Sequence, residues 1–140
     1  MPLVQKGILA FSDRIPKVIS PTAHAVADYA TLGGFILMGA LLWKRNRRAA
    51  IASLACAGAE AANTLLTDFP GGVAASISFQ THGRIDACLA AAAGSLPNFL
   101  AFAEAPEARF FRLMGLNITL VHALTDFGSS QLRPHLRKSA

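Results

Sequence analysis

The sequence predicts an all-α fold: an integral membrane four-helix bundle with up-down-up-down topology, preceded by an amphipathic interfacial helix. Composition is the first observation behind this prediction. Hydrophobic residues make up 53% of the 140 residues and charged residues only 15%, so a soluble domain of this size would expose much apolar surface. The second observation is that the apolar residues form four runs, each close to the ~20 residues that cross a bilayer as a helix. The whole chain, 1–140, is therefore expected to form a single membrane domain.

The first predicted element is an amphipathic helix within residues 1–20. Apolar residues such as Ile8 and Leu9 recur there at roughly helical spacing, with charged residues such as Lys6 and Asp13 between them. Because these charges are spread through the segment, it lacks the charged start and clean apolar centre of a cleavable signal peptide. We therefore expect this helix to lie in the membrane interface.

Four membrane spans are predicted next, separated by polar or proline-containing turns. Pro97 lies inside the third run and predicts a kink there. The four runs cover residues 22–43, 49–67, 81–103 and 110–127. An even number of spans places both ends of the chain on the same side of the membrane.

Orientation depends on the basic residues that flank the spans. Six Lys and Arg residues lie on the side of the two short turns and six on the side of the termini, so the positive-inside count is tied. The dense basic turn at 44–48 favours a cytoplasmic position for that side, with the basic tail, residues 128–140, opposite. A bacterial-type inner membrane is the expected location.

Histidine and aspartate recur inside the apolar runs at the same spacing. His24 and Asp28 begin the first run, and His82 and Asp86 begin the third, displaced by 58 positions (82−24). Residues four apart share one face of a helix, so each pair points in one direction. Ionisable residues in apolar helices are costly, and they usually mark a functional site.

A repeated tetrapeptide supports an internal duplication. Leu-Thr-Asp-Phe occurs at 66–69 and again at 124–127, at the same displacement of 58 (124−66). The pattern predicts two hairpin repeats, 22–69 and 80–127, related by a pseudo-twofold axis along the membrane normal. The polar residues that survive in both repeats are then expected to define a site between them.

We expect the polar residues to converge at one depth, near the membrane face where the chain begins and ends. Four carboxylates close together in a low-dielectric site need a compensating positive charge, and a divalent metal supplies it. Imidazole and carboxylate ligands suit zinc, iron or manganese. The predicted metal ligands are His24, Asp28, Asp68, His82, Asp86, His122 and Asp126.

Two further residues are predicted to take part in chemistry. Glu60 lies deeper on the second run, where a carboxylate that does not bind the metal would serve as a general base. Arg84 lies on a different face from His82 and Asp86 and would clamp a phosphate-bearing substrate. Cys56 and Cys88 lie inside predicted spans, without the close pairing of a metal-thiolate site.

These residues favour a metal-dependent membrane hydrolase or oxidoreductase that acts on a lipid-like or small apolar substrate. Two other active classes stay open: a proton- or cation-linked transporter or channel, and an electron carrier with His24 and His82 as axial haem ligands. A purely structural membrane protein is the remaining alternative. Membrane lipids are the expected partners, and a second copy of the chain, in a homo-oligomer, is a further expected partner. Nucleic acid is not expected, because the basic residues flank apolar runs.

Overall fold

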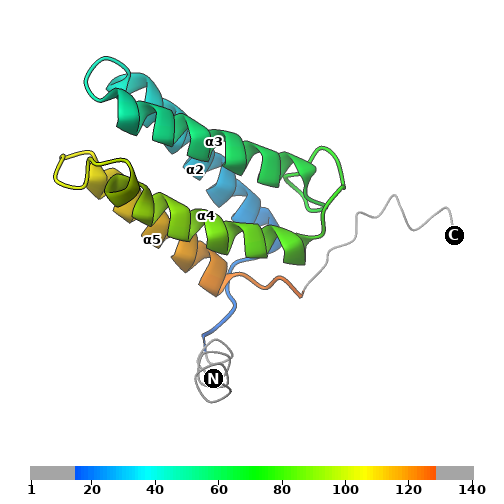
Figure 1. Ribbon diagram of the computed structural model, residues 1–140. Coiled ribbons are helices and arrows are strands. Elements are labelled where there is room, and N and C mark those ends of the chain that lie inside the picture. Colours follow the sequence, from blue (N-terminus) through cyan, green and yellow to red (C-terminus); the bar gives the residue numbers. More distant parts are fainter. Residues whose placement is uncertain (1–14, 129–140) are drawn as a thin grey trace, which may run out of the picture.

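Two antiparallel helical hairpins lie side by side (Figure 1). The structure is a computed structural model, and it describes residues 15–128. Within that range the chain forms four helices and no strands, which confirms the predicted all-α class. The helices are α2 (Pro21–Leu42), α3 (Arg47–Leu66), α4 (Phe79–Phe99) and α5 (Ala108–Leu124).

Short polar side chains begin three of the helices. Ser20 Oγ accepts a hydrogen bond from the Ala23 amide at 3.2 Å and starts α2. Ser78 caps α4 in the same way, through the Thr81 amide at 3.1 Å. Asn46 caps α3. These caps satisfy amides that have no partner within the helix.

The end of α4 corrects the predicted third run. The helix stops at Phe99, two residues after Pro97, instead of continuing through a kink to residue 103. The Phe102 amide donates to the Pro97 carbonyl at 2.9 Å, and Ala101 takes the left-handed conformation, with φ 54°. This is a Schellman-type helix end, in which glycine is the usual residue at the left-handed position.

The segment before α2 also differs from the prediction. Residues 15–20 form no helix, although they belong to the predicted interfacial helix. Ile19 is instead extended and pairs with Thr125, because its amide donates to the Leu124 carbonyl at 3.0 Å. The rest of the predicted interfacial helix, 1–14, and most of the basic tail, 129–140, lie outside the described residues.

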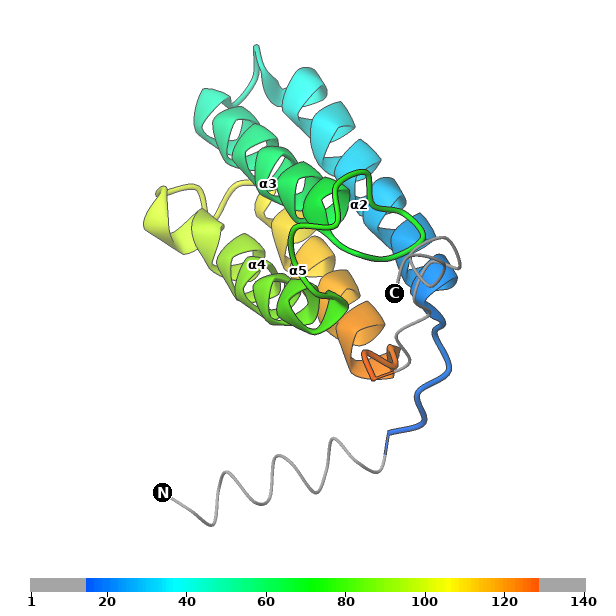
Figure 2. The same ribbon diagram turned by 90° about the vertical axis from the view of Figure 1, so that its right-hand side faces the viewer.

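A second extended pair joins the two hairpins. Ile77, just before α4, pairs with Thr67, just after α3, and its amide donates to the Leu66 carbonyl at 3.0 Å. The connection from α3 to α4 passes beside the start of α2 (Figure 2), where the Tyr29 hydroxyl donates to the Gly71 carbonyl at 2.7 Å. All four helix ends on this side are therefore tied together.

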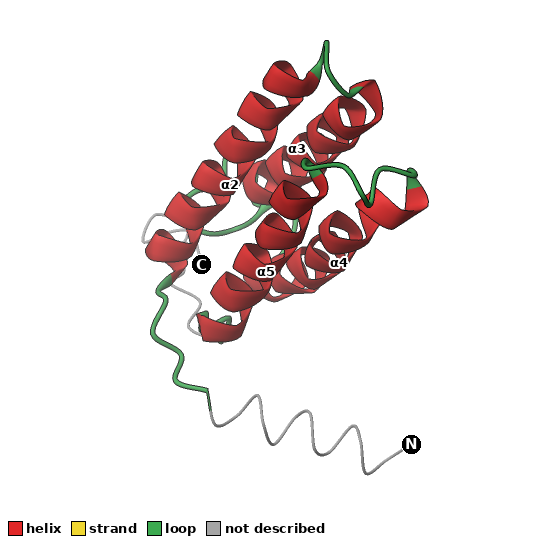
Figure 3. Cartoon of the chain, turned by 90° about the vertical axis from the view of Figure 1, so that its left-hand side faces the viewer, coloured by secondary structure: helices red, strands yellow, loops and turns green. Residues whose placement is uncertain are grey.

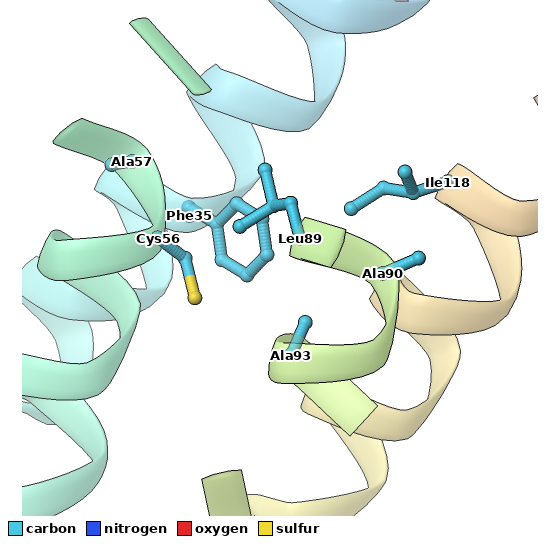
Figure 4. Packing of buried hydrophobic residues seen from close by; sticks show 7 residues of the cluster. All are labelled: Phe35, Cys56, Ala57, Leu89, Ala90, Ala93 and Ile118. Atoms are coloured by element: carbon cyan, nitrogen blue, oxygen red, sulfur yellow. The ribbon is translucent and has the colours of Figure 1, made fainter. Parts of the chain in front are cut away.

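Small residues let the helices approach closely in the apolar core. Phe35 fills the space between the hairpins, against alanines of α3 and α4 (Figure 4). Cys56 is buried in this cluster, whereas Cys88 is exposed, so the two thiols do not meet. The cluster consists of Phe35, Cys56, Ala57, Leu89, Ala90, Ala93 and Ile118.

The expectation of four membrane spans is met only in part. Among the described residues, α2 and α3 are long and apolar enough to cross a membrane. In contrast, α5 has only 17 residues, and α4 carries Gln80, His82, Arg84 and Asp86 in its first half. All four helices run along a common direction, with both short turns at one end (Figure 3).

Candidate metal centre

Two histidines and two aspartates from α2 and α4 meet inside the bundle. His24 and Asp28 come from the first turns of α2, and His82 and Asp86 from the first turns of α4. Both histidines are fully buried, and the aspartates are 4% and 2% exposed. Each side chain offers one ligand atom, and these four atoms lie within 4.8 Å of one another.

The imidazole nitrogens face each other across the centre of this cluster. His24 Nε2 and His82 Nε2 are 3.1 Å apart. Asp86 Oδ2 lies 3.1 Å from His24 Nε2 and 3.2 Å from His82 Nε2. The two oxygens of Asp28 divide between the histidines: Oδ1 is 3.3 Å from His24 Nε2 and Oδ2 is 3.3 Å from His82 Nε2. Both imidazoles are thus in contact with both carboxylates.

Two threonine hydroxyls determine which nitrogen of each histidine carries the proton. Thr67 Oγ1 donates to the Asn63 carbonyl at 2.6 Å, so its only proton is used. It must therefore accept from His82 Nδ1, at 2.9 Å. Thr125 Oγ1 donates to the Val121 carbonyl at 2.6 Å and accepts from His24 Nδ1 at 2.7 Å. The neutral form of either ring therefore carries its proton on Nδ1.

This tautomer leaves both Nε2 atoms as lone pairs that point into the cluster. Four acceptor groups then converge, because the carboxylates also carry only lone pairs. Such an arrangement in a buried site is unfavourable unless a cation lies between the groups. A metal ion or protons on the imidazoles would supply that charge. A hydrogen bond from the other ring nitrogen is also how proteins orient a histidine that binds metal.

Asn63 distinguishes the two aspartates. Its Nδ2 donates to Asp86 Oδ1 at 2.8 Å and reaches the His82 carbonyl at 3.3 Å. Asp28 Oδ2 accepts no hydrogen bond in the described part of the chain, although it is close to His82 Nε2. Position 121, which lies 58 residues after Asn63 (121−63), is Val121 and has no amide to offer. Asp28 is consequently the more weakly held carboxylate.

Three phenylalanines cover the histidines on the side of the helix starts. The Phe79 and Phe127 rings lie 5.3 and 5.4 Å from the His24 ring, edge on. Phe69 packs 5.2 Å from the His82 ring. Phe69 and Phe79 are almost completely buried, so this aromatic cover keeps water away from the cluster. The low dielectric strengthens every electrostatic interaction inside it.

A small cavity lies beside the two aspartates and contains a further carboxylate. It measures about 10 Å³, which is room for about one water molecule. Asp28, Glu60 and Asp86 line it, together with apolar side chains and Thr31. Glu60 is 2% exposed, and its Oε2 has no hydrogen-bond partner among residues 15–128. Glu60 thus faces the same space as the aspartates without joining the cluster.

Asp68 and Asp126 are not part of the four-residue group found among the described residues. Both follow the ends of their helices, where Thr67 and Thr125 are already extended, with ψ near 140° and 137°. Helical geometry therefore does not apply to Asp68 and Asp126, because each helix has already ended at the preceding threonine. Asp126 Oδ1 accepts from the Gly128 amide at 2.9 Å and caps that turn.

The remaining two predicted residues lie around the cluster and not in it. His122 packs its ring 5.0 Å from Phe127, and its buried Nδ1 has no hydrogen-bond partner in the described range. Arg84 is exposed on the outer side of α4. Neither residue contributes a ligand atom to the group of four.

Sequence reasoning missed the threonines of the site, although the repeated tetrapeptide contains them. The histidines, the aspartates and the threonine hydroxyls of the cluster all recur at the displacement of 58 (125−67). The pairing is crossed, because His24 bonds Thr125 and His82 bonds Thr67. Comparison with known protein families, curated proteins and solved structures finds no match to this chain.

Proposed function

We propose that this chain is a membrane protein that binds one divalent transition-metal ion between His24, His82, Asp28 and Asp86. One observation carries the proposal: two buried imidazoles, held in the Nδ1-protonated form by threonines, direct their Nε2 lone pairs at each other and at two carboxylates. Protons on both imidazoles would also balance the two carboxylates, but a single divalent cation balances them while it binds both Nε2 lone pairs.

The distances support a metal ion of ordinary size. In a tetrahedral site, neighbouring ligand atoms are separated by about 1.6 times the metal–ligand distance, or about 3.3 Å for ligands at about 2.0–2.1 Å. The five nitrogen–nitrogen and nitrogen–oxygen distances given above span 3.1 to 3.3 Å when each Asp28 oxygen is paired with its nearer histidine. One ligand atom from each residue gives a group that lies within 4.8 Å, so a four-ligand site would tighten around the ion. Two imidazoles and two carboxylates suit zinc, iron or manganese. The second oxygen of Asp28 allows a fifth ligand atom.

Membrane placement of all four helices is supported by the distribution of polarity. Histidine, carboxylate and amide side chains gather inside the bundle, whereas large apolar side chains are exposed along α2, α3 and α5. On α2 and α5, Leu37 is 60% exposed and Leu113 is 64% exposed. A lipid environment accommodates such a surface, and a pseudo-twofold pair of hairpins provides the matching polar interior.

The chemistry that fits this centre is a metal-dependent reaction on a small apolar or lipid-like substrate. A bound metal would polarise a substrate oxygen or activate a water molecule. Glu60 is positioned as the base, because it lines the water-sized cavity beside Asp28 and Asp86. The substrate would have to displace part of the aromatic cover formed by Phe69, Phe79 and Phe127.

The geometry gives less support to a haem-binding electron carrier and to a transporter or channel. Axial nitrogens on opposite sides of one haem iron are about 4 Å apart, at about 2 Å each, whereas His24 Nε2 and His82 Nε2 are 3.1 Å apart. A transport path would have to continue past Glu60 toward the short turns. One helical turn further in that direction, Cys56 belongs to the apolar cluster around Phe35.

Metal content tests the proposal. We expect the detergent-purified protein to retain about one equivalent of zinc, iron or manganese after dialysis against a weak chelator, and the double variant His24→Ala, His82→Ala to retain none. His122→Ala is the matched control, because it removes a nearby histidine that lies outside the cluster. Absence of metal from the folded wild-type protein, or equal metal in the double variant, would contradict the proposal.

A further inference from the structure

The end of the bundle opposite the metal centre contains a basic cleft between the two short turns. The cleft measures about 730 Å³ and lies between the start of α3 and the turn that joins α4 to α5. Arg45, Arg47 and Arg48 line it from one hairpin, and residues 101–105 line it from the other. It is therefore made by both hairpins together, at a position that the metal centre does not use.

Within residues 15–128, carboxylates do not neutralise the positive charge of this cleft. Glu104 is the one carboxylate in its lining, against three guanidinium groups. Among residues 15–128, the ion pairs within 4.0 Å all belong to the His-Asp cluster, so none of the three arginines is paired. Unpaired guanidinium groups around a concavity are suited to bidentate recognition of a phosphate group.

Two features hold the cleft in shape. The Arg47 guanidinium lies 4.7 Å from the centre of the Trp43 ring, which orients this side chain. On the other wall, Arg112 donates to the Ala103 carbonyl at 3.2 Å and fixes the turn. The phosphate site would thus be largely formed before a ligand binds, which lowers the entropy cost of binding.

Apolar side chains continue from the cleft along the outside of the helices. Phe99, beside the turn, is 82% exposed. Tryptophan is typical of the membrane interface, where one edge of its ring stays in contact with water. Exposed apolar residues on the helix segments that lead to the cleft include Leu41, Trp43, Ile51, Phe99 and Leu100. A ligand that fits both surfaces has an anionic phosphate head and hydrocarbon chains.

We propose that this cleft, lined by Arg45, Arg47 and Arg48, binds the phosphate headgroup of an anionic phospholipid. The acyl chains then lie against the exposed apolar side chains of α2 and α3. This inference is independent of metal binding and rests only on the proposed membrane placement. It also assigns the basic end of the bundle to the headgroup layer of an anionic leaflet.

Trp43 is the single tryptophan of the chain and reports binding directly. In nanodiscs, brominated phosphatidylglycerol should quench its fluorescence more strongly than brominated phosphatidylcholine at the same mole fraction. The double variant Arg45→Gln, Arg48→Gln should lose this selectivity while it keeps the Arg47–Trp43 contact. The matched control is Lys17→Gln, Arg84→Gln, which removes the same charge from the opposite end and should keep the selectivity.

Each alternative outcome overturns the inference in a recognisable way. Equal quenching by the two lipids in the wild type, or unchanged selectivity in the folded arginine variant, would show that the cleft does not select the headgroup. Displacement of phosphatidylglycerol by inorganic phosphate would identify a soluble phosphate as the ligand. If neither lipid quenches Trp43, the membrane placement on which this inference rests is contradicted. That result would not bear on the metal-binding proposal.

Discussion

At the scale of residues, the threonines control the chemistry of the histidines. Each hydroxyl donates its proton to a carbonyl four residues earlier and leaves a lone pair for the imidazole Nδ1. The consequence is a pair of Nε2 atoms that can only accept a proton or bind a cation. The Leu-Thr-Asp-Phe tetrapeptide therefore contacts the His-Asp cluster through its threonine and phenylalanine, and its aspartate lies outside the cluster.

The variants Thr67→Val and Thr125→Val test this role. Loss of the hydroxyl removes the partner of Nδ1, so the ring orientation and the tautomer are no longer fixed, and metal affinity should fall about 10- to 100-fold. Competition with a chromophoric chelator measures the affinity. Thr119→Val is the matched control, because this hydroxyl also donates to a carbonyl four residues earlier but, among the described residues, makes no hydrogen bond with His24 or His82. An unchanged metal affinity in both site variants would show that the threonines do not orient the histidines for metal binding.

A second residue-scale prediction concerns the left-handed residue Ala101, which is independent of the metal centre. Its φ of 54° is costly for a residue with a Cβ atom. Ala101→Gly should stabilise the protein by about 1 kcal/mol, seen as a higher melting temperature by circular dichroism in detergent. The same change in the middle of α4, Ala91→Gly, should instead destabilise it. Destabilisation by Ala101→Gly would refute the assigned helix end.

At the scale of elements, each hairpin depends on close helix contacts and each helix supplies one part of the site. Helices α2 and α4 carry the four proposed metal ligands, whereas the ends of α3 and α5 carry the orienting threonines. The extended pairs Ile19–Thr125 and Ile77–Thr67 fix these ends against the helix starts. Distortion of either hairpin would therefore move an imidazole relative to its threonine.

Two glycines test the importance of this packing. A Cβ atom on Gly115 would lie 2.7 Å from the Ala90 carbonyl oxygen, so Gly115→Ala must separate α4 from α5 and should cost about 1–3 kcal/mol. Gly58 has open space around it, and Gly58→Ala should stabilise α3 by about 0.5–1 kcal/mol. Melting temperatures of the two variants should move in opposite directions. An unchanged or higher melting temperature of Gly115→Ala would contradict the close contact between α4 and α5.

The sequence was sufficient to predict the four helices and the pairing of each histidine with its aspartate. Hydrophobic runs and proline punctuation determine the helices, and a spacing of four determines the shared face. Helical periodicity could not place Asp68 and Asp126, because the backbone becomes extended at the preceding threonines. The crossed His–Thr contacts depend on how the hairpins pack, which no local pattern encodes.

At the scale of the whole molecule, the two ends of the bundle differ in chemistry. At one end, buried phenylalanines cover the His-Asp cluster. At the other end, three arginines line an open cleft. Apolar side chains cover the helices between them. Under the proposed membrane placement, the arginine end meets headgroups and the metal centre lies near the opposite face.

Metal binding by the whole protein should depend on pH. Each Nε2 must be free of a proton to bind the ion, so acid competes with metal. The affinity should fall with decreasing pH, by about tenfold per unit for each proton displaced. Chelator competition at several pH values measures this dependence. An affinity that is independent of pH in the acidic range would indicate that the histidines are not ligands.

X-ray absorption spectroscopy of the metal-loaded protein shows directly whether the two histidines and two aspartates bind the metal ion. We expect a shell of nitrogen and oxygen ligands at about 2.0–2.1 Å, with the outer scattering of two imidazole rings and no sulfur. The variant His82→Gln should lose the signal of one ring. A spectrum without imidazole scattering, or with sulfur at about 2.3 Å, would contradict a centre formed by His24, His82, Asp28 and Asp86.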